Sequence, residues 1–288
     1  MKRLLFALGA AAGCTVSGAA PRDTVQEPVV VLEGLTVIPM TTPDAAVPSP
    51  ASILIRGERI ADVYPTGRRP APAGARRLDL TGRYAIPGLV DAHVHLTGQF
   101  NRPGQQDSLA RFLLLGGVTA VRDMAGDGIV LQERARAARS GAVASPRIYY
   151  STLIGSPEHF ATDRRVPSIA RGGPVGRLAW MRGIASETDA REAASGAAEI
   201  GATGVKAYAG LTPALLAAAA REAHARGLTV WSHAGVGPAK PWDAVTAGVD
   251  VLSHAPYLVL EHGATAAEPA VRVQRGIEHR AAALHLGE

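Results

Sequence analysis

From Pro87 onward, short apolar runs alternate with helical segments, and this alternation is the feature that most limits how the chain can fold. Strands that alternate with helices predict a parallel sheet, because a crossover helix returns the chain to the end where the next strand begins. The predicted strands are Leu89–Leu96, Val118–Asp123, Arg147–Leu153, Thr203–Tyr208, Leu228–His233 and Val249–His254. The predicted helices are Gln105–Leu115, Ile129–Ser140, Glu187–Ile200, Pro213–Arg226 and Lys240–Ala247.

This pattern predicts the α/β class and an incomplete (β/α)8 TIM-type barrel. We count about six strand–helix units, whereas a complete barrel needs eight. Residues 155–186 are rich in glycine, proline and arginine and are predicted to form a long loop. No convincing strand follows Glu261, although Pro269–Leu284 has a helical pattern. We therefore expect a chain that is truncated or read out of frame near its C-terminus, with the edges of its first and sixth barrel strands exposed.

Histidines lie at the ends of three predicted strands. Residues 86–96 read Ile-Pro-Gly-Leu-Val-Asp-Ala-His-Val-His-Leu, and His93 and His95 leave the same face because side chains on a strand alternate. His233 and His254 end two later strands. The carboxyl ends of barrel strands converge on one face, so these imidazoles are expected to meet there as metal ligands. The alternative is a structural role, at a strand edge for the first pair and in the core for the second.

Three further residues are candidates for a role beside these histidines. Asp91 precedes His93 on the same strand face and is expected to orient it. Tyr208 lies just past Lys206 and Tyr257 just past His254, and both are candidate substrate contacts.

The order of these motifs resembles a known family. The block Pro-Gly-Leu-Val-Asp-Ala-His-Val-His, then Gly-Val-Thr-Ala-Val-Arg-Asp, then Lys206, His233 and His254 is similar to the amidohydrolase superfamily. The similarity is to its imidazolonepropionase-like and prolidase-like branch, over roughly 29–257. It implies that residues 21–85 form part of a small β-sandwich, that 86–260 form the incomplete hydrolase barrel, and that 261–288 are an atypical tail.

The same resemblance implies a binuclear metal site. His93 and His95 would bind one divalent ion and His233 and His254 a second, with Zn²⁺ the expected metal and a carboxylated Lys206 as the bridge. An apolar neighbourhood favours the neutral amine that can capture carbon dioxide, and the alternative is a salt-bridging lysine. The family's catalytic aspartate follows strand eight, which the chain is not expected to reach. The catalytic residue is therefore unknown.

The first 20 residues predict an export signal. Lys2 and Arg3 precede an apolar stretch that is too short to span a bilayer, and small residues follow it. The single cysteine, Cys14, stands in a context that resembles a bacterial lipoprotein signal. We expect a periplasmic or secreted protein, with a lipid anchor at Cys14 as the alternative.

Charge and hydropathy narrow the function further. The net charge is +5, but the basic residues form no run, so nucleic-acid binding is not expected. No other segment is long and apolar enough for a transmembrane helix. The sequence predicts an exported hydrolase that cleaves a carbon–nitrogen bond of a small non-peptide or dipeptide-like amide by metal-bound hydroxide. The alternatives are a catalytically inactive remnant and an exported binding protein of the same fold, and a homo-oligomer is left open.

Overall fold

The structure is a computed structural model that describes residues 27–41, 49–97 and 105–262. The chain divides into two compact units, one up to Pro87 and one from Gly88 onward. The predicted export signal, Cys14 and the helix predicted at Pro269–Leu284 lie outside the described residues. Within the described ranges, the helices are too short or too polar to cross a membrane.

The first unit is a small β-sheet. Its central strand β1 (Val29–Val37) pairs antiparallel with β2 (Ala51–Arg56) and parallel with β4 (Arg76–Asp79) and β5 (Tyr84–Ala85). Strand β3 (Arg59–Pro65) pairs antiparallel with β2. A turn at Gly57 separates β2 from β3, and its φ of 54° suits glycine because other residues rarely adopt it. Val31, Leu54 and Tyr64 form the buried cluster of this sheet.

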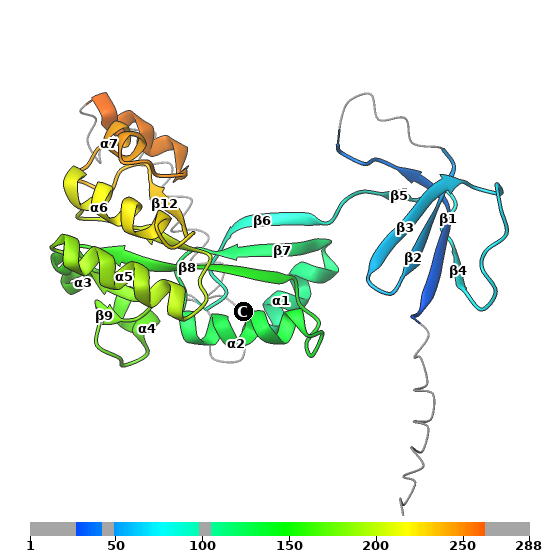
Figure 1. The fold of residues 1–288 in the computed structure, drawn as a ribbon, viewed down its shortest axis with the longest axis horizontal. Helices are drawn as coiled ribbons and strands as arrows, with labels where there is room; N and C mark the ends of the chain where they lie inside the picture. The colour runs from blue at the N-terminus through cyan, green and yellow to red at the C-terminus, as the bar shows by residue number, and fades with distance from the viewer. Residues whose placement is uncertain (1–26, 42–48, 98–104, 263–288) are drawn as a thin grey trace, which may run out of the picture. The chain divides into compact units, whose positions relative to one another are not determined.

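The second unit is a curled half-barrel whose sheet has six parallel strands (Figure 1). Their order is β6 (Leu89–Val94), β7 (Val118–Asp123), β8 (Arg147–Gly155), β11 (Gly204–Ala207), β12 (Thr229–His233) and β13 (Val251–Ser253). The prediction of an incomplete TIM-type barrel is therefore confirmed. Among the described strands, β6 pairs only with β7 and β13 only with β12, so they are the two edges of this row of six parallel strands.

Helices cover this sheet at the places that the sequence predicts. The longer ones are α1 (Gln105–Leu115), α2 (Gly128–Arg139), α5 (Glu187–Glu199) and α6 (Pro213–His224). The short helix α7 (Pro241–Thr246) precedes β13, and a 3-10 helix, η1 (Ala255–His262), follows it. Side-chain oxygens of Asp127, Ser186 and Thr212 accept backbone N–H groups at the starts of α2, α5 and α6, which explains where these helices begin.

The prediction of a long loop over residues 155–186 is wrong in part. The segment contains helices α3 (Pro157–Thr162) and α4 (Val166–Ala170) and a short antiparallel ribbon, β9 (Arg177–Leu178) with β10 (Met181–Gly183). β10 also pairs parallel with the end of β8. Elements of two to six residues show no clear hydrophobic period, and tertiary contacts decide whether they form.

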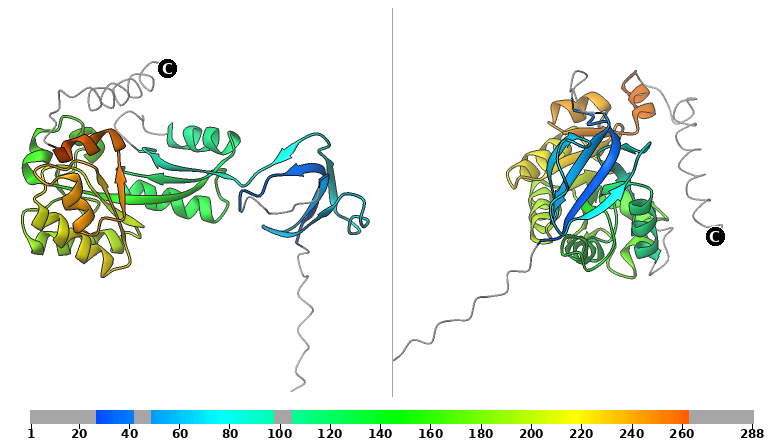
Figure 2. Two further views of the ribbon diagram at one scale, coloured as in Figure 1. Left: turned by 90° about the horizontal axis from the view of Figure 1, so that it is seen from above. Right: turned by 90° about the vertical axis from the view of Figure 1, so that its right-hand side faces the viewer.

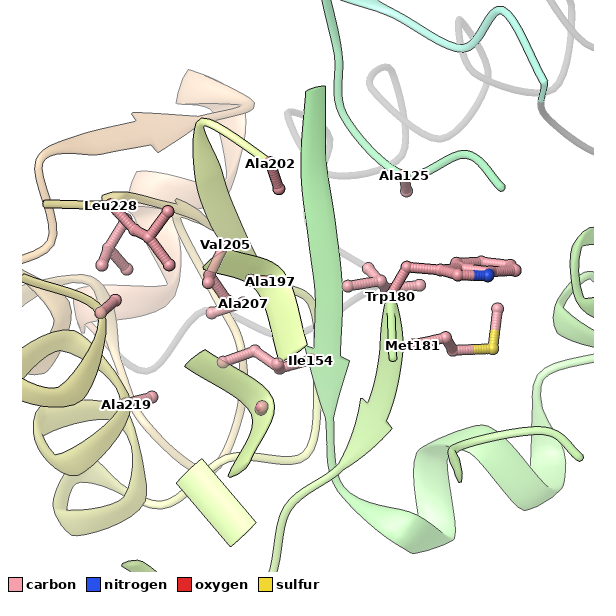
Figure 3. Close-up of a cluster of buried hydrophobic side chains, with 14 of the residues drawn as sticks. Ala125, Ile154, Trp180, Met181, Ala197, Ala202, Val205, Ala207, Ala219 and Leu228 are labelled. Atoms are coloured by element: carbon pink, nitrogen blue, oxygen red, sulfur yellow. The ribbon is translucent and has the colours of Figure 1, made fainter. Parts of the chain in front are cut away.

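Alternation along the strands gives the sheet two different faces. Val205 and Ala207 of β11 belong to the main buried cluster, together with Ala197 of α5 and Ala219 of α6 (Figure 3). Helices α5 and α6 pack against each other (Figures 1 and 2) and also against β11. Because side chains alternate, Lys206 leaves β11 on the face away from these helices.

Candidate functional site

The first two histidines stand at the carboxyl end of β6. His93 is in the strand and His95 follows its last residue, and their ring centroids are 5.3 Å apart. The backbone amide of His93 donates to Oδ1 of Asp91 at 3.1 Å. In the described hydrogen bonds, Asp91 thus holds the main chain of His93 instead of its ring, which differs from the orienting role that the sequence suggests.

The other two histidines come from the opposite end of the sheet. His233 is the last residue of β12 and His254 follows β13, and their ring centroids are 4.5 Å apart. The rings of His93 and His254 are 5.1 Å apart, so all four imidazoles form one continuous cluster. His254 has a φ of 64°, which residues with a side chain rarely adopt and which often occurs at functional sites.

Lys206 completes the cluster from β11, the strand next to β12. Its side chain is 1% exposed, and its Nζ lies 3.4 Å from Nε2 of His93. The five residues that the sequence nominates as metal ligands therefore lie together at the carboxyl ends of four strands.

The protonation of the histidines suits metal binding. Burial, assisted by the charge on Lys206, lowers the pKa of His93 to about 2 and the pKa of His95 to about 3. Burial also holds the pKa of His233 well below its ordinary value. Protein atoms surround the ring of His95, but the residue as a whole is exposed to water, so we expect screening to make the fall in its pKa smaller than burial alone would give. Neutral imidazoles carry the lone pair that a divalent ion requires, so the donor chemistry fits a metal.

The arrangement of the side chains fits a metal ion less closely than their chemistry does. Within residues 27–41, 49–97 and 105–262, no three histidine, cysteine, aspartate or glutamate side chains converge as ligands of one ion. The rings touch one another and Lys206, but they would have to turn before they could share an ion.

Two tyrosines flank the cluster. The ring of Tyr208 lies 4.5 Å from the ring of His233, between centroids. The ring of Tyr257 lies 5.9 Å from His254 and 6.3 Å from His233. Both candidate substrate contacts thus stand beside the histidines.

An arginine and a histidine extend the polar surface beyond Tyr208. The guanidinium carbon of Arg165 lies 5.5 Å from the centroid of the Tyr208 ring, and the ring of His159 lies 5.1 Å from it. Nε and Nη2 of Arg165 donate hydrogen bonds to the carboxylate of Asp163 at 3.0 and 2.6 Å. Nε2 of His159 is buried and makes no hydrogen bond to the described residues, and it lies 3.5 Å from Oδ2 of Asp163. The sequence pattern did not single out Arg165, because it lies in the segment predicted as loop. The one signal for structure in this segment was the pair Ser156-Pro157, which is typical of a helix start.

Comparison with curated proteins gives short, partial matches. The chain is 42% identical over 66 residues to a 5-methylthioadenosine/S-adenosylhomocysteine deaminase of Symbiobacterium thermophilum, which covers 23% of this chain and 15% of that protein. It is 47% identical over 51 residues to an imidazolonepropionase of Rubrobacter xylanophilus, which covers 16% of this chain and 12% of that protein. The matched region is thus a small part of each relative.

Comparison with solved structures gives a similar fold over most of the chain. A prolidase complexed with N-methylphosphonate-L-proline superposes with a TM-score of 0.62 at 24% identity, covering 82% of this chain and 65% of that one. A Xaa-Pro dipeptidase with bound methionine superposes with a TM-score of 0.64 at 22% identity, covering 81% of this chain and 63% of that one. The chain therefore spans less than two thirds of either structure, and the likeness concerns the fold.

A family model covers the region that carries the cluster. The model of the Amidohydrolase family matches residues 84–258, which is more than half of the chain. The matched range includes all of the barrel strands and the five clustered residues. The chain belongs to the amidohydrolase family.

Proposed function

We propose that this chain is a metal-dependent hydrolase that cleaves a carbon–nitrogen bond in a small-molecule amide. The observation that carries the proposal is the cluster of four histidines and one buried lysine at neighbouring strand ends of a single sheet. Membership of the amidohydrolase family and similarity to deaminases support the reaction class.

The clustered residues would hold one or two divalent ions, for which Zn²⁺ is our expectation. His93, His95, His233 and His254 would supply neutral nitrogen donors, and Lys206 would bridge as a carbamate. Such an ion, when bound, supplies a water activated near neutral pH and polarises a substrate carbonyl.

The chain's own groups would prepare the site for that chemistry. Because burial keeps His93 and His233 unprotonated, their lone pairs are available at neutral pH without loss of a proton. The phenol groups of Tyr208 and Tyr257 stand beside the histidines, where an O–H can donate to the oxygen of a substrate amide. These tyrosines would orient the substrate. The side chains around Arg165 would make the remaining contacts with it.

The test is the metal content of the full chain after loading with Zn²⁺ and removal of excess ion. We expect bound zinc in the unchanged protein and a loss in each of His93→Ala, His95→Ala, His233→Ala and His254→Ala. His224→Ala is the matched control, because His224 is exposed and pairs with Asp250 at 2.9 Å, away from the cluster. Zinc content that stays the same in all four variants would refute the assignment.

A binding protein without turnover is the second candidate. It is favoured by the described side chains, in which no three conventional ligands converge on one point. If the unchanged chain takes up no zinc but still binds small amides in calorimetry, this second candidate is the better account. Hydrolysis of an amide panel by the zinc-loaded chain would exclude it.

A further inference from the structure

Asp123 is a buried carboxylate that holds the main chain next to the first histidine pair. It is the last residue of β7 and is 0% exposed. Its Oδ2 accepts the amide N–H of Leu96 at 2.6 Å, and its Oδ1 accepts the amide N–H of Ala125 at 3.1 Å. Leu96 directly follows His95, so the carboxylate joins the ends of β6 and β7 at the histidine position.

Two more bonds tie the same strand ends together. The amide of Met124 donates to the carbonyl of Val94 at 3.0 Å, on the other side of His95. The hydroxyl Oγ1 of Thr97, a residue with 2% exposure, accepts the amide of Asp127 at 2.7 Å. His95 therefore lies between main-chain atoms that are fixed from β7 on both sides.

Close packing leaves this arrangement little room to move. A Cβ on Gly126 would lie 2.1 Å from Oγ1 of Thr97 and 2.9 Å from Oδ1 of Asp123, so only glycine fits at this position. We call Asp123, Thr97 and Gly126, together with the amides that they contact, the β6–β7 clasp.

We propose that the β6–β7 clasp, with Asp123 at its centre, positions His93 and His95 toward Lys206 and the other two histidines. This inference rests on the proposed function, since the positions matter for metal binding. Asp123 is a positioning residue, because the hydrogen bonds described for its two oxygens go to main-chain amides.

The chemistry of the clasp requires a carboxylate. Both oxygens of Asp123 accept main-chain N–H groups, and a carboxylate is the side chain of this length with two accepting oxygens. In Asp123→Asn, one of the two positions becomes an NH₂ donor that faces another N–H donor. One backbone amide then loses its partner, and the strand end that carries His95 has to shift.

The matched control is Asp127→Asn. Asp127 is four residues away and also accepts backbone amides, from Ile129 at 3.0 Å and Val130 at 3.3 Å, but both bonds go to Oδ1. Asparagine caps a helix as well as aspartate does, so the exchange leaves these bonds intact. The backbone amide of Asp127 belongs to the clasp, but its side chain does not. The two variants therefore make the same chemical change at a side chain inside the clasp and at a side chain outside it.

The experiment compares the full-length chain with these variants in two measurements. Zinc affinity comes from competition with a coloured chelator, and the positions of the rings come from nitrogen-detected NMR of the metal-free histidines. For Asp123→Asn we expect affinity weaker by about 10- to 100-fold, the range for loss of a group that orients metal ligands, and shifted ring signals of His93 and His95. Asp127→Asn should match the unchanged protein in both. A folded Asp123→Asn with unchanged affinity and unchanged ring signals would overturn the inference.

A second pair of variants covers the case in which Asp123→Asn does not fold. Thr97→Val removes the hydroxyl that accepts the amide of Asp127, and Thr97→Ser keeps it. We expect the valine variant to weaken zinc binding and shift the His95 ring, and the serine variant to restore both. A valine variant that behaves like the unchanged chain overturns the inference. If the unchanged chain binds no zinc, the proposed function fails, while the ring signals of the metal-free protein still decide the role of the clasp.

Discussion

The side chain of Lys206 is the least ordinary feature at the scale of single residues. It is 1% exposed, and its Nζ lies against the ring of His93, so a permanent ammonium there would carry a desolvation cost of several kcal/mol. If the ammonium loses a proton, the neutral amine can add carbon dioxide and release a second proton, which gives an anionic carbamate with two oxygens. Among neutral imidazoles, that group and a divalent ion stabilise each other.

This argument predicts a carbamate on Lys206. The full chain, supplied with zinc and ¹³C-labelled bicarbonate, should show a carbamate carbonyl signal by NMR. Lys206→Met should lose the signal and the bound zinc, while the exposed Lys240→Met should retain both. A carbamate signal that persists in Lys206→Met would contradict the assignment to this residue.

The residues that the sequence nominated share one property, which is their place at strand ends. His93, His95, Lys206, His233 and His254 could be predicted to meet because parallel strands bring their carboxyl ends to one edge. The contacts of Arg165 and Asp123 could not be predicted in this way. Arg165 reaches Tyr208 from a segment without a regular period, and Asp123 acts on an amide 27 residues earlier in the chain. Such pairings depend on tertiary structure and leave no local pattern.

At the scale of elements, Gly204 sets the distance between β11 and β12. A Cβ at this position would lie 2.4 Å from the carbonyl oxygen of Thr229 and 2.4 Å from the ring of Trp231. The two strands carry Lys206 and His233, so their separation decides whether these side chains can share a ligand. A larger residue would have to displace backbone or a packed indole.

We therefore predict that Gly204→Ala destabilises the chain by about 1–3 kcal/mol, the usual cost of overpacking a core. Urea unfolding of the full chain measures the change, and zinc content should fall with it. Gly116→Ala is the control, because a Cβ there would meet its nearest neighbour at 3.4 Å, which is ordinary contact. Equal unfolding midpoints for the two variants would contradict the prediction.

The sequence predicts the long helices and strands better than the short ones. Helix α1 and strand β7 have the predicted bounds, and the other long elements agree within a few residues. The hydrophobic pattern of these elements extends over enough residues to be recognised in a single sequence. The ribbon of β9 and β10 has five residues in all and forms because β10 finds a partner in β8, a contact that the local sequence does not encode.

Exposed apolar side chains of the second unit predict self-association. Among the described residues, Val90 of β6 is 69% exposed, and Phe112 and Leu115 of α1 are 73% and 78% exposed. Exposed apolar patches favour contacts between chains. In sedimentation velocity, we expect larger species to increase with concentration and to decrease in the double variant Phe112→Lys/Leu115→Lys. Ile60→Lys, at an exposed position of the first unit, should have little effect, and an unchanged distribution in the double variant would contradict the prediction.

At the scale of the whole molecule, the buried titratable groups of the site make stability depend on pH. His93 and His233 have pKa values far below 6.5 because burial disfavours the imidazolium. Between about pH 3 and 6.5 the unfolded chain binds a proton at each histidine that the folded chain does not, so acid lowers the free energy of unfolding. Asp123 acts in the opposite direction, because burial raises its pKa to about 6 and its folded form binds the extra proton. The two histidines lower the stability in acid and the one aspartate raises it, so the net effect of these three groups is a loss of stability in acid.

The prediction is a fall in the free energy of unfolding of the metal-free chain as the pH drops below about 6.5. A net difference of one proton corresponds to roughly 1.4 kcal/mol per pH unit, and His95 adds less because the residue is exposed and water screens its charge. Urea titrations at a series of pH values from neutral to about 4.5 measure the slope. His233→Gln should flatten the slope, since one of the two histidine protons is removed. Stability that is constant or higher in acid would show that these imidazoles are not held neutral by the fold.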